Sequence, residues 1–160
     1  MNFRRHIEQV GNKLESRRKI NRIQIKTRTD LIDATKKKSG LYWIETNMPI
    51  DDLKSAIYLC SGKKKNTRKT KPDGIGFTQR VNEYQIIYVG TENDLQKRLL
   101  EHLFNEGDKG TTKMSIKIDC LLFSKYEWYI SCVYLKDDPT RYSIEAWWRL
   151  NIGWPPFCIR

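Results

Sequence analysis

The segment from Tyr84 to His102 most constrains the fold, because it predicts a buried strand that leads directly into an amphipathic helix. The run Tyr84–Val89 is apolar and β-branched, as in buried strands, and Gly90 closes it. Asn93 and Asp94 are helix-capping residues, and the leucines that follow recur on one face through about residue 104. A helix of this kind needs a sheet on which to bury that face.

The rest of the chain mixes strand-like and helix-like segments without a repeated strand–helix–strand unit. Pro139 is expected to break the chain, Ser143 to cap the last helix, and Gly153 to end it. This order predicts an α+β fold with a small, mainly antiparallel sheet flanked by helices and an N-terminal basic helical arm. Helices are predicted over 4–18, 30–37, 49–58 and 143–152, strands over 21–26, 39–46, 84–89, 114–118 and 126–135, and a turn over 107–112.

Positive charge is concentrated in the first part of the chain. The 160 residues include 30 Lys and Arg against 19 Asp and Glu, a net charge of +11. Residues 1–38 carry +8, residues 39–90 carry +3, and residues 91–160 are neutral. A concentrated excess of this kind attracts polyanions, so nucleic acid is the leading partner class.

A loop between Gly62 and Pro72 contains no acid and no large apolar residue. We interpret it as a basic surface loop, and we divide the chain into a basic arm over 1–38 and a domain over 39–160. The loop residues predicted to bind DNA are Lys63, Lys64, Lys65, Arg68, Lys69 and Lys71.

Several classes of protein are excluded. No segment approaches the roughly 20 apolar residues of a membrane span, and the N-terminus lacks the apolar run of a signal peptide. We therefore expect a cytoplasmic protein without a membrane partner. The four cysteines stand far apart and form no C-x-x-C pair, which argues against a zinc finger.

Arg98 and His102 are candidates for phosphate chemistry. They lie four residues apart, and therefore on one face of the predicted helix, beside the stripe that contains Leu99. We expect both side chains to point out of the core. Arginine offers a planar fork of donors that suits phosphate, and histidine can carry a proton near neutral pH.

With its neighbours, this segment resembles the GIY-YIG nuclease family. Tyr88-Val89-Gly90 stands where that family has its second tripeptide, and Arg98 and His102 follow at the positions of its arginine and histidine. Gly40-Leu41-Tyr42 resembles the first tripeptide. Glu145 stands at about the separation of the metal-binding glutamate, and Pro155-Pro156-Phe157 resembles the closing motif. The resemblance covers residues 39–160.

This sequence departs from the family pattern in two places. Tyr42 and Tyr88 are 46 residues apart, which implies a basic insertion at about 47–80. Phe77 lies at the family's usual distance from Tyr88 but has no hydroxyl, so we favour Tyr42 as the first tyrosine. Cys158 replaces the closing asparagine, for which Asn151 is a candidate substitute.

The resemblance implies a metal-dependent mechanism. Glu145 would bind Mg²⁺ or Mn²⁺, and Arg98 would stabilise charge on the phosphate. Tyr42 would activate the attacking water and pass its proton to His102 or to bulk water, while Tyr88 would position the water or a phosphate oxygen. The site residues are therefore Tyr42, Tyr88, Arg98, His102 and Glu145.

The function that we expect is a restriction-like endonuclease acting on double-stranded DNA, either as a homodimer or by sequential nicking. A catalytically silent, basic nucleic-acid-binding module is the alternative, in which Arg98 and His102 only hold phosphate. A structural partner of an acidic protein is a third possibility.

Overall fold

The strands over Gly40–Thr46 and Trp128–Tyr134 carry apolar side chains on both faces, and they form the centre of a four-stranded sheet. The computed structural model describes residues 2–65, 71–108 and 112–158. The order is β1 (Ile23–Gln24), β4 (Trp128–Tyr134), β2 (Gly40–Thr46) and β3 (Gln85–Glu92), and every neighbouring pair is antiparallel. The α+β class and the antiparallel sheet are thus confirmed.

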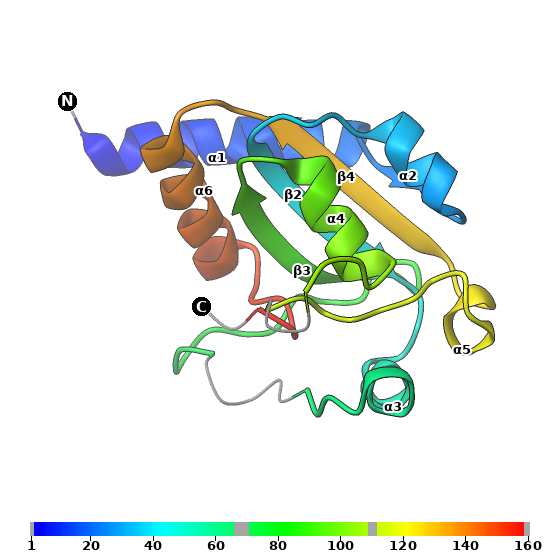
Figure 1. Ribbon diagram of the computed structural model, residues 1–160. Coiled ribbons are helices and arrows are strands. Elements are labelled where there is room, and N and C mark those ends of the chain that lie inside the picture. The colour runs from blue at the N-terminus through cyan, green and yellow to red at the C-terminus, as the bar shows by residue number, and fades with distance from the viewer. Residues whose placement is uncertain (1, 66–70, 109–111, 159–160) are drawn as a thin grey trace.

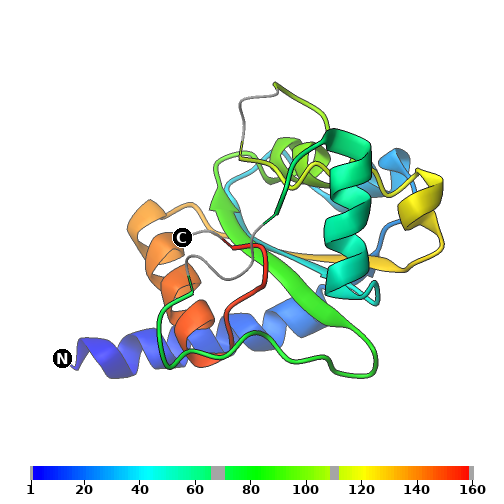
Figure 2. The same ribbon diagram turned by 90° about the horizontal axis from the view of Figure 1, so that it is seen from below.

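Helices cover both faces of this sheet (Figure 1 and Figure 2). One face packs against α2 (Arg28–Ala34), α3 (Ile50–Ser61) and α4 (Leu95–Leu103), and α5 (Leu121–Ser124) lies beside α3. The other face packs against α1 (Phe3–Ile20) and α6 (Asp138–Asn151). The edge strand β3 contacts both α4 and α6. Within the described ranges, no helix is long and apolar enough to cross a bilayer.

The segment that we predicted as a basic arm packs against the rest of the chain. Helix α1 packs on α6 and β4, and it approaches so closely at Gly11 that a Cβ atom there would lie 2.3 Å from the Trp147 ring. Leu14 joins the core on that face, and β1 pairs with β4. The exposed basic side chains of α1 therefore lie on the opposite side of the sheet from α4.

The predicted strand over residues 114–118 is wrong. Its alternation reflects real burial, since Met114, Ile116 and Ile118 are all in the core. The backbone instead runs along the end of α4, where the N–H groups of Ile116 and Ile118 donate to the carbonyls of His102 and Leu103. The last carbonyls of a helix have no partner within it, so this segment satisfies them in place of a strand neighbour.

The predicted start of the last helix is also wrong. Helix α6 begins at Asp138, with Pro139 in its first turn, and the Asp137 side chain accepts a hydrogen bond from the Thr140 N–H. Proline is tolerated in a first turn because the N–H that it lacks would have no helical acceptor there. Glu145 consequently lies in the middle of α6 and not at its N-terminus.

Candidate active site

The pairing of β2 with β3 brings two predicted site tyrosines together. Tyr42 pairs with Gly90, and Ile44 pairs with Tyr88, so the two tyrosines are diagonal neighbours. Their rings stack with centroids 5.9 Å apart. A Cβ atom on Gly90 would lie 2.6 Å from the Tyr42 hydroxyl, so only glycine allows the phenol to lie over the backbone of β3.

His102 contacts the rings of both tyrosines. Its Nε2 lies 2.9 Å from the Tyr42 hydroxyl oxygen, and its Nδ1 lies 3.0 Å from the backbone nitrogen of Met114. A backbone N–H can only donate, so Nδ1 accepts. In the neutral imidazole the proton therefore lies on Nε2, which donates it to the oxygen of Tyr42.

Our expectation that His102 points out of the core is wrong. Its side chain is completely buried, because β2 lies on one side of it and the segment after Thr112 covers the other. Burial lowers the pKa of His102 well below its usual value, and the charges of Arg98 and Lys65 add to this shift. His102 is therefore a neutral donor, with no nitrogen left to receive a proton from Tyr42.

The two phenols are difficult to ionise in this environment. Burial raises the pKa of Tyr42 well above its usual value, Tyr88 adds to the rise, and Arg98 opposes it. Burial likewise raises the pKa of Tyr88, with an opposing effect from the nearby guanidinium groups of Arg98 and Arg149. Only added positive charge, or a stronger hydrogen bond to the oxygen, would favour the phenolate.

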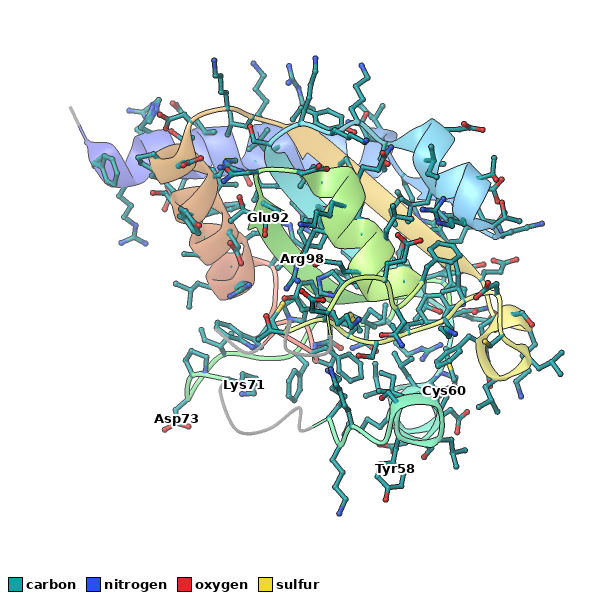
Figure 3. The ribbon with its side chains drawn as sticks, in the orientation of Figure 1. Tyr58, Cys60, Lys71, Asp73, Glu92 and Arg98 are labelled. Atoms are coloured by element: carbon teal, nitrogen blue, oxygen red, sulfur yellow. The ribbon has the colours of Figure 1, made fainter. Side chains whose placement is uncertain are left out.

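Arg98 projects from α4 between that helix and β3 (Figure 3). One of its nitrogens donates to Glu101 at 2.7 Å, and another lies 3.3 Å from the hydroxyl of Thr112. Its side chain is 14% exposed, so the guanidinium is partly desolvated but reachable. An open pocket of about 400 Å³ adjoins it, lined by Glu92, Asn93, Asp94, Lys97, Arg98 and Glu101.

Glu145 approaches β3 from the opposite layer. Its carboxylate forms an ion pair with Arg149, one turn later on α6, and Arg149 also donates to the Val89 carbonyl at 3.1 Å. Burial raises the pKa of Glu145, and the Arg149 guanidinium opposes that rise. The guanidinium groups of Arg98 and Arg149 lower the pKa of Tyr88 and the Glu145 carboxylate raises it, so both ion pairs act electrostatically on this phenol.

Cys158, for which the resemblance implies an asparagine, lies against β3. Its sulfur accepts a hydrogen bond from the Val89 N–H at 3.3 Å and donates to the Val89 carbonyl at 3.2 Å. The closing segment thus lies along β3, where the Phe157 N–H also donates to the Ile87 carbonyl. Asn151 does not substitute for the missing asparagine, since it is exposed and bonds to the Trp147 carbonyl of its own helix.

Phe77 lies outside this cluster. It pairs through its backbone with Trp154 and packs on the face of the sheet that α1 and α6 cover. Tyr42 is therefore the aromatic residue of the first half of the chain that contacts Tyr88 and His102.

The structure describes four of the six predicted DNA-binding residues. Lys64 is exposed, and Lys63 and Lys65 are partly buried. The Lys71 ammonium donates to the Ile75 carbonyl and lies 5.4 Å from the Phe77 ring centre. Arg68 and Lys69 lie outside the described residues.

None of these site residues lines the pocket formed by Glu15, Glu45, Thr78, Trp148 and their neighbours. It has a volume of about 530 Å³ and lies between the ends of α1 and α6 and the loop that precedes β3. Its charged groups pair with one another, as in Arg18 with Glu15 and Arg22 with Glu45. Of the residues predicted for the site, Arg98 lines the pocket of about 400 Å³ described above.

A metal ion would find few protein ligands at this site. Of the residues that the structure describes, no three His, Cys, Asp or Glu side chains cluster at metal-binding distance. Glu145 offers a single carboxylate, one oxygen of which bonds to Arg149. Such a donor set fits Mg²⁺, which is often bound by one or two carboxylates, substrate phosphates and water.

Sequence reasoning missed Glu101 and Arg149, the ion-pair partners of Arg98 and Glu145. Their spacing of three and four residues on one helix is the signal that could have indicated them. Comparisons with models of protein families, with curated proteins and with solved structures found no match.

Proposed function

We propose that this protein is a metal-dependent endonuclease of the GIY-YIG type that hydrolyses phosphodiester bonds in double-stranded DNA, as restriction enzymes do. One observation carries the proposal: the five residues chosen from the sequence come together at Tyr88, because Tyr42 and His102 contact its ring and Arg98 and Glu145 act on it electrostatically. They are Tyr42, Tyr88, Arg98, His102 and Glu145, and they come from β2, β3, α4 and α6.

Arg98 is the group best suited to bind the scissile phosphate. It is partly desolvated, adjoins an open pocket, and is oriented by Glu101. A preorganised donor in such an environment stabilises charge that develops on phosphate oxygens during hydrolysis. Tyr88, on which both Arg98 and Arg149 act electrostatically, would position the attacking water or a phosphate oxygen.

Tyr42 is the proposed proton acceptor. Water forms a bond to phosphorus, one P–O ester bond breaks, and the leaving oxygen takes a proton from solvent. Tyr42 first loses its phenol proton to bulk solvent, and the attacking water then gives its proton to the phenolate oxygen, which His102 stabilises by donating from Nε2. Of the two proton acceptors expected from the sequence, His102 and bulk water, we retain bulk water, because Nδ1 of His102 already accepts from the Met114 N–H.

Glu145 would hold Mg²⁺ or Mn²⁺. A bound divalent cation polarises the phosphate and helps to neutralise the leaving oxygen. Because Arg149 already pairs with this carboxylate, the side chain of Arg149 would have to move when a cation binds.

A catalytically silent, DNA-binding module is the second candidate. The Glu145–Arg149 pair favours it, since this pair neutralises the only carboxylate proposed as a metal ligand. The raised pKa of Tyr42 favours it as well. In that case Arg98 and the basic residues would hold DNA without cutting it.

Cleavage of supercoiled plasmid with Mg²⁺, with and without a chelator, tests the proposal. We expect chelator-sensitive nicking, and we expect Arg98→Ala to slow it by about 100-fold or more through loss of one preorganised donor. Arg80→Ala is the matched control, because Arg80 is exposed and donates to the backbone carbonyls of Asn47 and Glu83. Binding without any cleavage would favour the silent module.

A further inference from the structure

Three consecutive residues, Thr112, Lys113 and Met114, contact three different parts of the site. Thr112 lies within hydrogen-bond distance of Arg98, the Lys113 carbonyl accepts from the Lys65 ammonium at 2.9 Å, and the Met114 N–H donates to His102. A lysine from the basic insertion is therefore held on the same short backbone segment as Arg98 and His102.

This segment is well anchored. The Lys113 side chain is only 4% exposed, and its ammonium donates to the carbonyls of Asn105, Glu106 and Gly107 at 3.2, 2.8 and 3.1 Å. Ile116 adds the backbone hydrogen bond to His102. The carbonyl that accepts from Lys65 thus belongs to a segment held by the Lys113 side chain and by the backbone of Ile116.

Lys65 differs from its neighbours in the insertion. It is partly buried, its charge lies close enough to His102 to lower the pKa of that imidazole, and burial lowers its own pKa. A lysine has three N–H donors, and the Lys113 carbonyl takes one. Two donors are then left for an anion bound beside the segment 112–114, which also contacts Arg98.

We propose that Lys65 is a phosphate-binding residue of the active site, acting with Arg98, and not only one of the lysines that attract DNA at long range. This inference rests on the proposed function and deepens it. The ligand would be the scissile phosphate or the phosphate next to it, with Arg98 providing the planar fork and Lys65 a compact charge.

Calorimetric titration with thymidine 3′,5′-bisphosphate tests this inference without requiring catalysis. We expect Lys65→Met, which keeps an apolar stem of similar length, to weaken binding about tenfold or more, as loss of a hydrogen bond to a charged group does. Arg98→Met should weaken it similarly. Lys117→Met is the charge-matched control, since Lys117 is exposed. The affinity of this variant for the bisphosphate should stay within about twofold of wild type. Thermal melts establish that the variants fold.

An affinity of Lys65→Met within twofold of wild type would overturn the inference, and so would a wild-type protein that does not bind the bisphosphate. Single-turnover cleavage of duplex DNA by the same proteins tests the proposed function separately. If the wild type cleaves DNA and Lys65→Met binds the bisphosphate as well as the wild type does, the proposed endonuclease function is supported and the proposed role of Lys65 is wrong. Weakened binding without cleavage by wild type would keep Lys65 at a phosphate site of a silent module.

Discussion

The closest packing in the candidate site is between Gly90 and Tyr42, and it makes Gly90→Ala an informative substitution. The added methyl carbon would lie 2.6, 2.7 and 2.9 Å from the hydroxyl oxygen and two ring carbons of Tyr42. The phenol cannot move aside easily, because it is 1% exposed, stacks on Tyr88 and bonds to His102.

Three contributions decide the change in stability. Overpacking a filled core costs about 1–3 kcal/mol, and displacing the hydroxyl from His102 costs about 1 kcal/mol more. Replacing glycine within a strand gains about 0.5–1 kcal/mol. The net expectation for Gly90→Ala is a loss of about 1–3 kcal/mol, which corresponds to a melting temperature lower by about 2–12 °C in a chain of this size.

Urea denaturation of the wild type and the variant measures this difference. Gly76→Ala is the control, since a Cβ atom there meets nothing within 4 Å, and its stability should change by no more than about 0.5 kcal/mol. Gly90→Ala should lower the free energy of unfolding by less in a Tyr42→Phe background, because that background lacks the hydroxyl oxygen that lies nearest to the added methyl group. Equal effects of the two glycine substitutions would refute the packing described for Tyr42.

Three further predictions concern the metal ligand, the proton acceptor and the packing of α1. Glu145→Gln should slow divalent-dependent cleavage by about 100-fold or more while DNA affinity in a filter-binding assay changes less than about threefold. The single-turnover rate should keep rising with pH above neutrality, because the proton acceptor is the Tyr42 phenolate and the pKa of Tyr42 is raised. Tyr42→Phe should abolish this rise. A rate that reaches a plateau above about pH 6.5 would instead indicate a histidine base. Gly11→Ala should lower the melting temperature, because its methyl group would overlap the Trp147 ring where α1 meets α6; an unchanged melt would contradict that packing.

Local patterns in the sequence predicted the strand and helix that carry Tyr88 and Arg98. The apolar run through Val89 and the Asp94 cap specify the start of α4 within a few residues, because both signals act over one turn. The partnership of Tyr42 with Tyr88 came from the family resemblance, and the antiparallel register brings the two rings together across a long insertion.

Features that depend on a third segment could not be predicted in this way. Helical spacing places His102 beside Arg98 but does not indicate that the chain after Thr112 covers that face and buries the imidazole. The place of Glu145 in the middle of α6 could not be predicted either, because the proline in the first turn concealed the start of that helix.

The structure of the protein bound to a short DNA duplex with Ca²⁺ tests most directly whether this cluster is a phosphodiesterase site. We expect one backbone phosphate with oxygens about 3 Å from the guanidinium of Arg98, the cation on Glu145, and the Arg149 side chain displaced from that carboxylate. A duplex bound elsewhere, for example along the basic face of α1, with no phosphate near Arg98 and the Glu145–Arg149 pair intact, would contradict the proposal.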